Sequence, residues 1–309
     1  MKNFQLLKAF RAGYFKYKRL FADVGLELGQ CELINGVNIV LLVDRKKSIV
    51  YRCALNALGR EGIINNYKFL TESKVEGIPA PIALVHKGGA VVSAERFLSG
   101  KPVGVNDQER FSAIMDQLFL CYKVNLVQVE FDVRQWFEHY DRYLRFIDPV
   151  YAQKLADLKV NLIKKWPSGR QAAVHTYIHG DLTFRNILVE GGKIFFFDFD
   201  RSCIDFPEFD ALLFRLDLLT HQTGRSSYDV FLDHLAQFAH GKTDVPLLED
   251  FYDRNPAFAG NTHIKGLKYL FLYRALIFGL YDLNNKEKFN LNRFDKLLQE
   301  LDEASSKDL

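Results

Sequence analysis

Three oxygen-bearing side chains, Asp181, Asn186 and Asp198, lie at short intervals in the middle of the chain. The apolar runs around them predict that Asp181 and Asn186 stand in a loop after a buried strand, and that Asp198 ends the hairpin that follows. One carboxylate for a hydroxyl nucleophile, plus a carboxylate and an amide for Mg²⁺, is the set that phosphoryl transfer requires. Mg²⁺ prefers such oxygen ligands to imidazole or thiolate. The spacing therefore predicts a phosphoryl-transfer centre between His179 and Asp200.

Two blocks of different secondary structure surround this centre. The first is rich in strands and contains one helix, Gly59–Ser73, and Asn35-Gly36 between two apolar runs predicts a hairpin. Its predicted strands are Cys31–Ile34, Val37–Asp44, Ser48–Ala54, Ile82–His86 and Ala90–Phe97. From about residue 105, apolar residues spaced by three and four predict helices, interrupted by a short hairpin around Gly191-Gly192.

These patterns predict an α+β protein with two lobes. Residues 1–98 are expected to form a small, β-rich N-terminal lobe with one main helix. Residues 99–309 are expected to form a larger, mostly helical C-terminal lobe that carries the catalytic and metal loops at 179–200. The predicted helices after the first lobe are Glu109–Val124, Val133–Phe146 and Tyr151–Trp166, then further helices from Phe206 and a helical tail from His263 to Leu301.

The central segment resembles the catalytic and metal loops of aminoglycoside phosphotransferases and choline kinases, which share the bilobal fold of protein kinases. The run HGDLTFRN, which begins at His179, and the aspartate after the next apolar strand carry the resemblance. It implies that Asp181 orients or deprotonates the acceptor hydroxyl. It also implies that Asn186 and Asp198 hold Mg²⁺ and that Asp200 assists them. His179 is expected to have a structural role in the loop.

The resemblance extends to the N-terminal lobe. Arg52 on the third strand and Glu61 on the next helix stand where the family has a basic residue paired with a glutamate, and the resemblance implies that they hold the phosphates of ATP. Glu95 begins the run ERFL, which resembles the hinge that binds the adenine edge. Judged by the residues alone, Arg52 and Glu61 could also be an ordinary surface pair. The sequence has no GxGxxG loop, and Asn35-Gly36 is a weak substitute.

The resemblance implies a Mg²⁺-dependent kinase that transfers the γ-phosphoryl group of ATP to a hydroxyl of a small molecule. A sugar, an amino sugar, an aminoglycoside or an amino alcohol would serve as acceptor. Two alternatives stay open. The run Asp198–Arg201 also resembles kinases of lipopolysaccharide core sugars, so the acceptor could be a lipid-linked or surface-glycan sugar. The Asp and Asn residues could also merely cap turns, in which case the chain would be an inactive pseudokinase scaffold.

Composition limits the remaining classes. The chain has 309 residues and a formal net charge of +3, which is too small to indicate a nucleic-acid partner. Its four cysteines are scattered, which favours a reducing compartment over a zinc site or a disulfide framework. No apolar run reaches the roughly 18 residues that span a bilayer, and no signal peptide is visible. We therefore expect a cytoplasmic protein, and the sequence does not indicate its oligomeric state.

Two charged segments allow two interpretations each. Residues 1–21 combine six basic residues with aromatic and apolar residues at helical spacing. They could form an amphipathic helix at the inner face of the membrane, or a helix that packs on its own domain. The acidic residues Glu249, Asp250 and Asp253 could bind an amine, or could form a solvated helix face.

Overall fold

The structure, a computed structural model, describes most of the chain. The described residues are 21–27, 30–36, 38–73, 75–87, 89–104, 108–222, 228–241, 251–264, 266–283 and 291–309. The expected N-terminal helix, apart from its last residue, and the acidic residues Glu249 and Asp250 lie outside them, so the expectations for these segments stay predictions.

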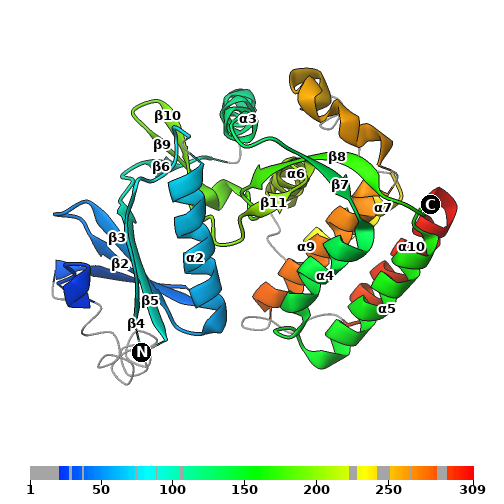
Figure 1. The fold of residues 1–309 in the computed structure, drawn as a ribbon, viewed down its shortest axis with the longest axis horizontal. Coiled ribbons are helices and arrows are strands. Elements are labelled where there is room, and N and C mark those ends of the chain that lie inside the picture. The colour runs from blue at the N-terminus through cyan, green and yellow to red at the C-terminus, as the bar shows by residue number, and fades with distance from the viewer. Residues whose placement is uncertain are drawn as a thin grey trace.

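A five-stranded antiparallel sheet forms the N-terminal lobe, with the strand order β1-β2-β3-β5-β4 (Figure 1). Its strands are β1 (Glu32–Asn35), β2 (Ile39–Asp44), β3 (Ile49–Ala54), β4 (Pro81–Lys87) and β5 (Ala90–Arg96). Strands β1 and β2 pair antiparallel from Asn35 and Val40 outward, which confirms the predicted hairpin. The strands also confirm the strand-rich character expected of this part of the chain.

Helix α2 (Ala57–Glu72) covers the face of the sheet that looks toward the C-terminal lobe (Figure 1). The side chain of Asn56 caps the helix by accepting a hydrogen bond from the backbone N–H of Gly59. Tyr51 and Cys53 pack on the opposite face, against Phe21. Because side chains alternate along a strand, Arg52 between them faces α2 and the other lobe.

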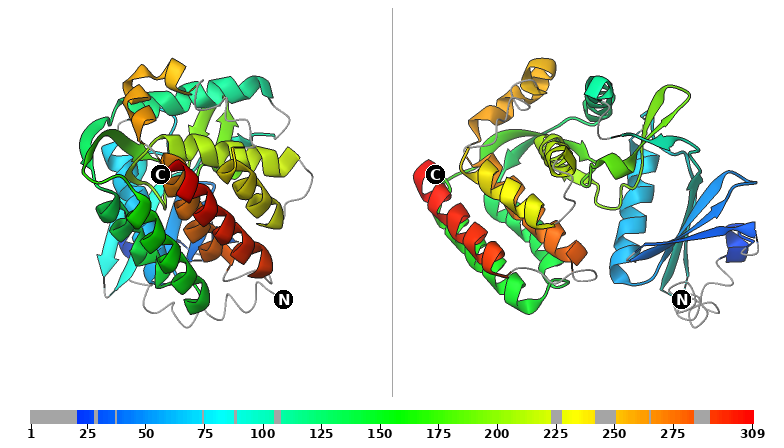
Figure 2. Two further views of the ribbon diagram at one scale, coloured as in Figure 1. Left: turned by 90° about the vertical axis from the view of Figure 1, so that its right-hand side faces the viewer. Right: turned by 180° about the vertical axis from the view of Figure 1, so that it is seen from behind.

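The C-terminal lobe is mostly helical. Its helices are α3 (Gln108–Lys123), α4 (Val133–Leu144), α5 (Pro149–Lys165), α6 (Glu208–Gln222), α7 (Tyr228–Ala239), α9 (Leu267–Leu283) and α10 (Leu291–Asp308), with 3₁₀ turns η2 (Phe184–Asn186) and η3 (Pro256–His263). Helices α5 and α10 pack together at the end of this lobe farthest from the sheet (Figure 2), and α5 also contacts α9. The two lobes and their mixed content confirm the expected bilobal α+β class.

Two small sheets follow the N-terminal lobe in the chain. One has the order β10-β9-β6 and contains the predicted hairpin, and the other has the order β11-β8-β7. Their strands are β6 (Lys101–Pro102), β7 (Val127–Phe131), β8 (Gln171–Ile178), β9 (Ile187–Glu190), β10 (Lys193–Phe196) and β11 (Cys203–Asp205). Sequence analysis missed β6, β7 and β11. Strands β6 and β11 are too short to show a period, and β7 stands between two strongly helical segments.

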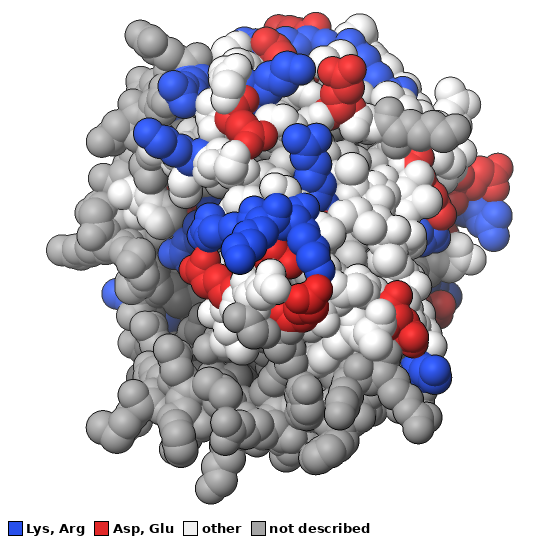
Figure 3. Space-filling model, turned by 90° about the vertical axis from the view of Figure 1, so that its left-hand side faces the viewer, with Lys and Arg blue, Asp and Glu red and all other residues white. Residues whose placement is uncertain are grey.

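The surface of the N-terminal lobe shows basic side chains next to acidic ones, not a field of one sign (Figure 3). Near the turn between β2 and β3, Arg45 binds Glu32 at 2.8 Å and Lys47 binds Glu27 at 3.1 Å. Within the ranges given above, no helix is both long and apolar enough to cross a bilayer.

Glu208 makes the stability of the C-terminal lobe depend on pH. Its buried carboxylate accepts a hydrogen bond of 2.9 Å from Asn261, a residue whose amide group also binds the backbone of β8. Burial raises the pKa of Glu208 from 4.5 to about 7. The folded chain therefore holds this proton more tightly than the unfolded chain does. The proton on Glu208 therefore stabilises the folded state fully at pH values below the pKa that this carboxyl has in the unfolded chain. This stabilisation is lost as the pH rises to about 7.

We expect Glu208→Gln, which cannot ionise, to remove this dependence. Between about pH 5 and about pH 8, the free energy of unfolding of the wild type should fall by on the order of 2–3 kcal/mol relative to that of the variant. Urea unfolding at both pH values measures the difference. If the difference in unfolding free energy between wild type and Glu208→Gln is the same at both pH values, the raised pKa of Glu208 is contradicted.

Candidate active site

The catalytic loop begins where β8 ends. The backbone N–H groups of His179 and Gly180 donate to the two carboxylate oxygens of Asp210, at 2.6 and 2.8 Å. Gly180 has a φ of 82°, and a Cβ built on it would lie 2.1 Å from the carbonyl oxygen of Arg201, so this position requires glycine. The first turn of α6 and a neighbouring loop thus hold the backbone that presents Asp181.

His179 connects the catalytic loop to the metal loop. Its buried ring accepts a hydrogen bond at Nδ1 from the N–H of Asp181 (3.3 Å). Nε2 therefore carries the proton and donates it to the carbonyl oxygen of Phe197 (2.9 Å). Both ring nitrogens are used within the protein, which fits the structural role expected for His179.

A buried arginine supports the same loop from the C-terminal lobe. Arg274, in the middle of α9, donates to the carbonyl oxygen of Gly180 at 2.7 Å and to the hydroxyl of Tyr140 at 2.9 Å. Tyr140 in turn hydrogen-bonds to Asp205, and so does the indole of Trp136, at 3.0 Å. Sequence analysis missed Arg274. A charged residue inside the mostly apolar run of α9 was the available signal, because a buried charge needs a hydrogen-bonding partner.

The metal loop packs on α2, although it belongs to the other lobe by sequence. The backbone N–H of Phe199 donates to the side-chain oxygen of Asn66 at 3.0 Å, and the rings of Phe199 and Phe69 stack at 4.0 Å. Gly62 allows the approach, since a Cβ there would lie 3.1 Å from the Asp200 side chain. Asp198 has a φ of 70°, an uncommon backbone conformation for a residue with a side chain and one that often marks a functional site.

One guanidinium faces three carboxylates at the centre of the site. Nη1 of Arg52 lies 2.7 Å from Asp198 and 3.0 Å from Asp200, and its Nε lies 3.2 Å from Glu95. Burial raises the pKa of Asp200 to about 7, with Asp198 and Glu95 adding to this effect and Arg52 opposing it. Burial also tends to raise the pKa of Asp198. The charge and hydrogen bond of Arg52 outweigh this effect, so the pKa of Asp198 lies below its usual value.

This centre fits a divalent cation bound by oxygen ligands. Negative charge exceeds positive charge at Asp198 and Asp200, and both are partly accessible, at 36% and 25% of their side-chain surface. Asn186 donates through its amide nitrogen to the carbonyl oxygen of Asp181 at 2.8 Å, a bond that leaves its side-chain oxygen available. The described residues contain no cluster of three His, Cys, Asp or Glu side chains suited to a metal, so the set depends on the amide of Asn186. The metal roles of Asn186, Asp198 and Asp200 stay predictions.

Comparison with known proteins agrees with this geometry. Residues 126–244 match the model of a family described as the phosphotransferase enzyme family. Amicoumacin kinase hAmiN, solved with AMP-PNP, Ca²⁺ and Ami, superposes with a TM-score of 0.54 at 16% identity, over 91% of this chain and 89% of its own. A putative aminoglycoside phosphotransferase from Ralstonia eutropha gives 0.55 at 15% identity, over 90% and 93%. A thermostable mutant of APH(4)-Ia in its apo form gives 0.53 at 11%, over 94% and 98%.

The chain has the aminoglycoside phosphotransferase fold. The family match over residues 126–244 and the shared fold confirm the resemblance seen in the sequence. No curated protein matches the sequence significantly.

Within this fold, the expected pairing of Arg52 with Glu61 is wrong. Arg52 pairs instead with Glu95, which lies on the neighbouring strand β5 and on the same face of the sheet. Glu61 points toward the other lobe, where Arg142 at the end of α4 lies at 3.0 Å and Arg145 at 4.0 Å. The resemblance implied a partner on the helix, whereas the alternation of side chains across the sheet provides a nearer one.

Glu95 also differs from its expected place. Its side chain is only 5% exposed, and it binds Asn66 at 2.7 Å in addition to Arg52. It lies inside β5, while the connection between the lobes follows Arg96 and precedes Lys101. The structure thus places the side chain of Glu95 as the partner of Arg52. The expected contact of the run that begins at Glu95 with an adenine edge stays a prediction.

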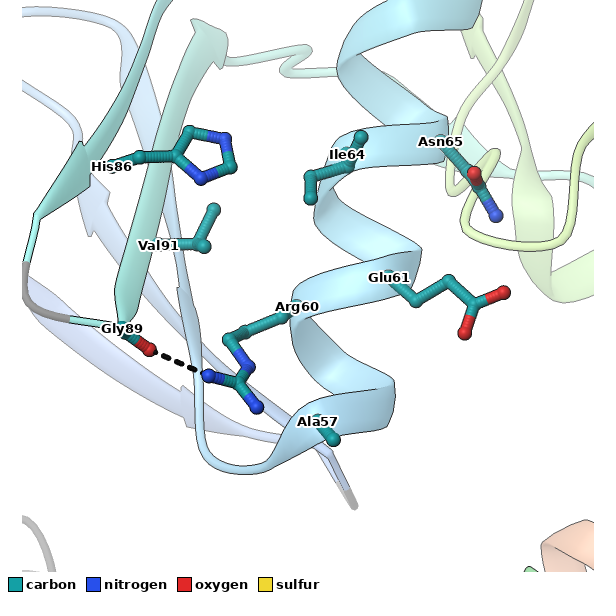
Figure 4. Close-up of a pocket in the computed structure, with 8 residues that line it drawn as sticks. All are labelled: Ala57, Arg60, Glu61, Ile64, Asn65, His86, Gly89 and Val91. Carbon is teal, nitrogen blue, oxygen red and sulfur yellow. Dashed lines mark hydrogen bonds between the residues drawn. The ribbon is translucent and has the colours of Figure 1, made fainter. Parts of the chain in front are cut away.

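Two hollows flank α2, and the smaller one contains Asp181, Asp198 and Asp200. This catalytic cleft, of about 120 Å³, is lined by Asn38, Leu58, Gly59, Glu61, Gly62, Asn65, Tyr143, Asp181, Asp198, Asp200, Arg201 and Phe278. The larger pocket, of about 340 Å³, lies between α2 and the β4–β5 hairpin (Figure 4). Figure 4 shows Ile64 directed toward His86, while Glu61 and Asn65 point away from it. The catalytic cleft is therefore the candidate active site.

Replacement of Arg52 tests the electrostatics of this site. Arg52→Met should lower the free energy of unfolding by about 3–5 kcal/mol, because it leaves buried carboxylates without their cation. Millimolar Mg²⁺ should then raise the melting temperature of the variant more than that of the wild type. Arg170→Met, which removes an exposed arginine paired with Glu130, provides the control. Equal responses of variant and wild type to Mg²⁺ would contradict the expected competition between Arg52 and the cation for these carboxylates.

Proposed function

We propose that this chain is a Mg²⁺-dependent kinase that transfers the γ-phosphoryl group of ATP to a hydroxyl group of a small molecule. The observation that carries the proposal is the catalytic cleft itself. Asp181, Asp198 and Asp200 come from two loops and line one cleft, with Arg52 directed at the last two. The family match and the shared fold support the same reaction.

Asp181 is the residue that acts on the acceptor. Its side chain is 30% exposed in the cleft, so a substrate hydroxyl can reach it. The hydroxyl donates a hydrogen bond to the carboxylate and passes its proton there, while its oxygen forms a bond to the γ-phosphorus. The bond between that phosphorus and the β,γ-bridging oxygen breaks, and ADP leaves with the electron pair. The backbone hydrogen bonds at His179 and Gly180 fix the position of Asp181.

The metal loop serves the nucleotide. When Mg²⁺ is bound, it neutralises charge on the β- and γ-phosphates. Asn186, Asp198 and Asp200 would hold it, and Arg52 orients the two carboxylates through its hydrogen bonds. Arg52 and Glu95 form a buried pair beside this loop that would face the phosphates.

The acceptor belongs to the small molecules with hydroxyl groups, and sugars, amino sugars, aminoglycosides and amino alcohols are the candidates. Structures of APH(4)-Ia contain ADP or AMP-PNP together with hygromycin B. An acceptor that is lipid-linked or part of a surface glycan is the second candidate, supported by the run Asp198–Arg201 and by the basic residues 1–21. Contact of that segment with a membrane and a cytoplasmic location stay predictions.

Two substitutions separate the roles of the loops. Asp181→Asn should retain the rise in melting temperature that millimolar Mg·ATP produces, because the nucleotide still binds the folded state. It should lower the rate of phosphoryl transfer, or of ATP hydrolysis without an acceptor, by about 10²–10⁴-fold. Asp198→Asn should lose the thermal shift itself. Asp157→Asn, on the exposed face of α5, is the control for an Asp-to-Asn change.

The same measurement addresses the scaffold alternative. If Mg·ATP produces no thermal shift in the wild-type protein, the chain does not bind nucleotide and the kinase proposal fails. If the nucleotide binds but Asp181→Asn hydrolyses ATP as fast as the wild type does, Asp181 is not the catalytic residue.

A further inference from the structure

The side chain of Asn66 on α2 joins two parts of the site that belong to different lobes in the sequence. Its Nδ2 donates to Oε2 of Glu95 at 2.7 Å, and its Oδ1 accepts from the backbone N–H of Phe199 at 3.0 Å. Glu95 lies on β5 of the N-terminal sheet, whereas Phe199 lies in the metal loop. Asn66 is 1% exposed, so water does not compete for either bond. Asn66 therefore links the sheet directly to the backbone of the metal loop.

A second path between the same two parts runs through Arg52. Its Nε donates to Oε1 of Glu95 at 3.2 Å, and its Nη1 donates to Asp198 at 2.7 Å and to Asp200 at 3.0 Å. The two carboxylate oxygens of Glu95 thus accept from different donors, one from Arg52 and the other from Asn66. The two paths close a ring of hydrogen bonds that holds the metal loop by its backbone and by both of its carboxylates.

The position of Asn66 in this ring requires an amide. The side chain there donates to a carboxylate on one side and accepts from a backbone N–H on the other, and the head group of asparagine does both without a charge. An aspartate would face Glu95 with a second carboxylate. A leucine of similar volume would remove the bonds to Glu95 and to Phe199 together. The identity of residue 66 therefore affects the geometry of the metal loop as well as the packing of α2.

We propose that Asn66 is a positioning residue that sets the affinity of the site for a divalent cation, because it holds Asp198 and Asp200 in place relative to Arg52. This inference rests on the proposed kinase function and deepens it. The described residues that line the two hollows do not include Asn66, so it acts through the metal loop and not by touching a substrate. Groups that orient metal ligands from outside commonly change metal affinity by about 10- to 100-fold.

Binding of a nucleotide analogue with and without metal tests the proposal. Isothermal titration calorimetry measures the dissociation constant of AMP-PNP for the full-length protein in millimolar Mg²⁺ and again in EDTA. Asn66→Leu removes both hydrogen bonds without changing the charge. We expect it to weaken the binding of Mg·AMP-PNP by about tenfold or more, and to change the binding of metal-free AMP-PNP by less than about twofold.

This difference separates positioning from loss of folding. If Asn66→Leu only shifted the equilibrium toward the unfolded chain, the apparent dissociation constant would rise by the same factor with and without metal, because it scales inversely with the folded fraction. Asn161→Leu makes the same change in the middle of α5, at a residue outside the described linings of both hollows, and should leave both constants unchanged.

A paired substitution decides the case in which Asn66→Leu does not fold. Asn66→Asp should weaken the binding of Mg·AMP-PNP, because the new carboxylate cannot donate to Glu95, although its negative charge alone would favour the cation. Adding Glu95→Gln exchanges donor and acceptor, so that the new amide donates to the new carboxylate and still accepts from Arg52. We expect this double variant to bind Mg·AMP-PNP about fivefold or more tightly than Asn66→Asp does.

The outcomes are distinct. Weakening confined to the metal complex, with recovery in the double variant, supports the proposal. Equal weakening with and without metal, or none, overturns it while the kinase function stands. So does a double variant that binds no more tightly than Asn66→Asp or does not fold, since the exchange keeps every bond of the ring. A wild-type protein that does not bind AMP-PNP, or binds it no better with Mg²⁺, overturns the proposed kinase function and, with it, this inference.

Discussion

The contact between Arg52 and the carboxylates around it is the interaction on which the rest of the site depends. A guanidinium that is 2% exposed cannot remain charged without partners, and this one has Glu95 from its own sheet and Asp198 and Asp200 from the metal loop. The contact joins residues 146 and 148 positions apart in the sequence. It therefore fixes the position of the metal loop against the sheet. The same excess of negative charge gives a divalent cation a place to bind.

A second buried network positions the catalytic loop. Asp210 accepts hydrogen bonds from the loop backbone, and Arg274 donates to it from the opposite side. Both buried charges are hydrogen-bonded to the loop backbone and to tyrosine hydroxyls, and these bonds hold the loop in one conformation. Here the conformation that they hold includes a glycine, Gly180, with no space for a Cβ. The network thus preserves a geometry that is costly for the chain to adopt and that presents Asp181 to the cleft.

The sequence predicted the features that depend on local order. The hairpin at Asn35-Gly36 and the loop from His179 to Asn186 follow from turn chemistry and apolar runs, and the bilobal class follows from the change of period along the chain. It did not predict the partner of Arg52 or the role of Arg274. Those depend on which side chains face one another after the sheet and helices have packed, and spacing along the chain does not contain that information. The strand β7 was missed for a related reason, because its pairing with β8 joins segments far apart in sequence.

The metal loop and the catalytic loop are supported by different parts of the molecule. The metal loop rests on α2 through Phe199, Asn66 and Phe69, whereas the catalytic loop rests on α6 and α9. They meet at the bond from His179 to Phe197 and at the pair of Arg201 with Asp181. A rotation of one lobe against the other would therefore appear at the site as a change in the separation between the catalytic carboxylate and the metal ligands. These two small contacts are therefore the places where a relative motion of the lobes would be transmitted to the site.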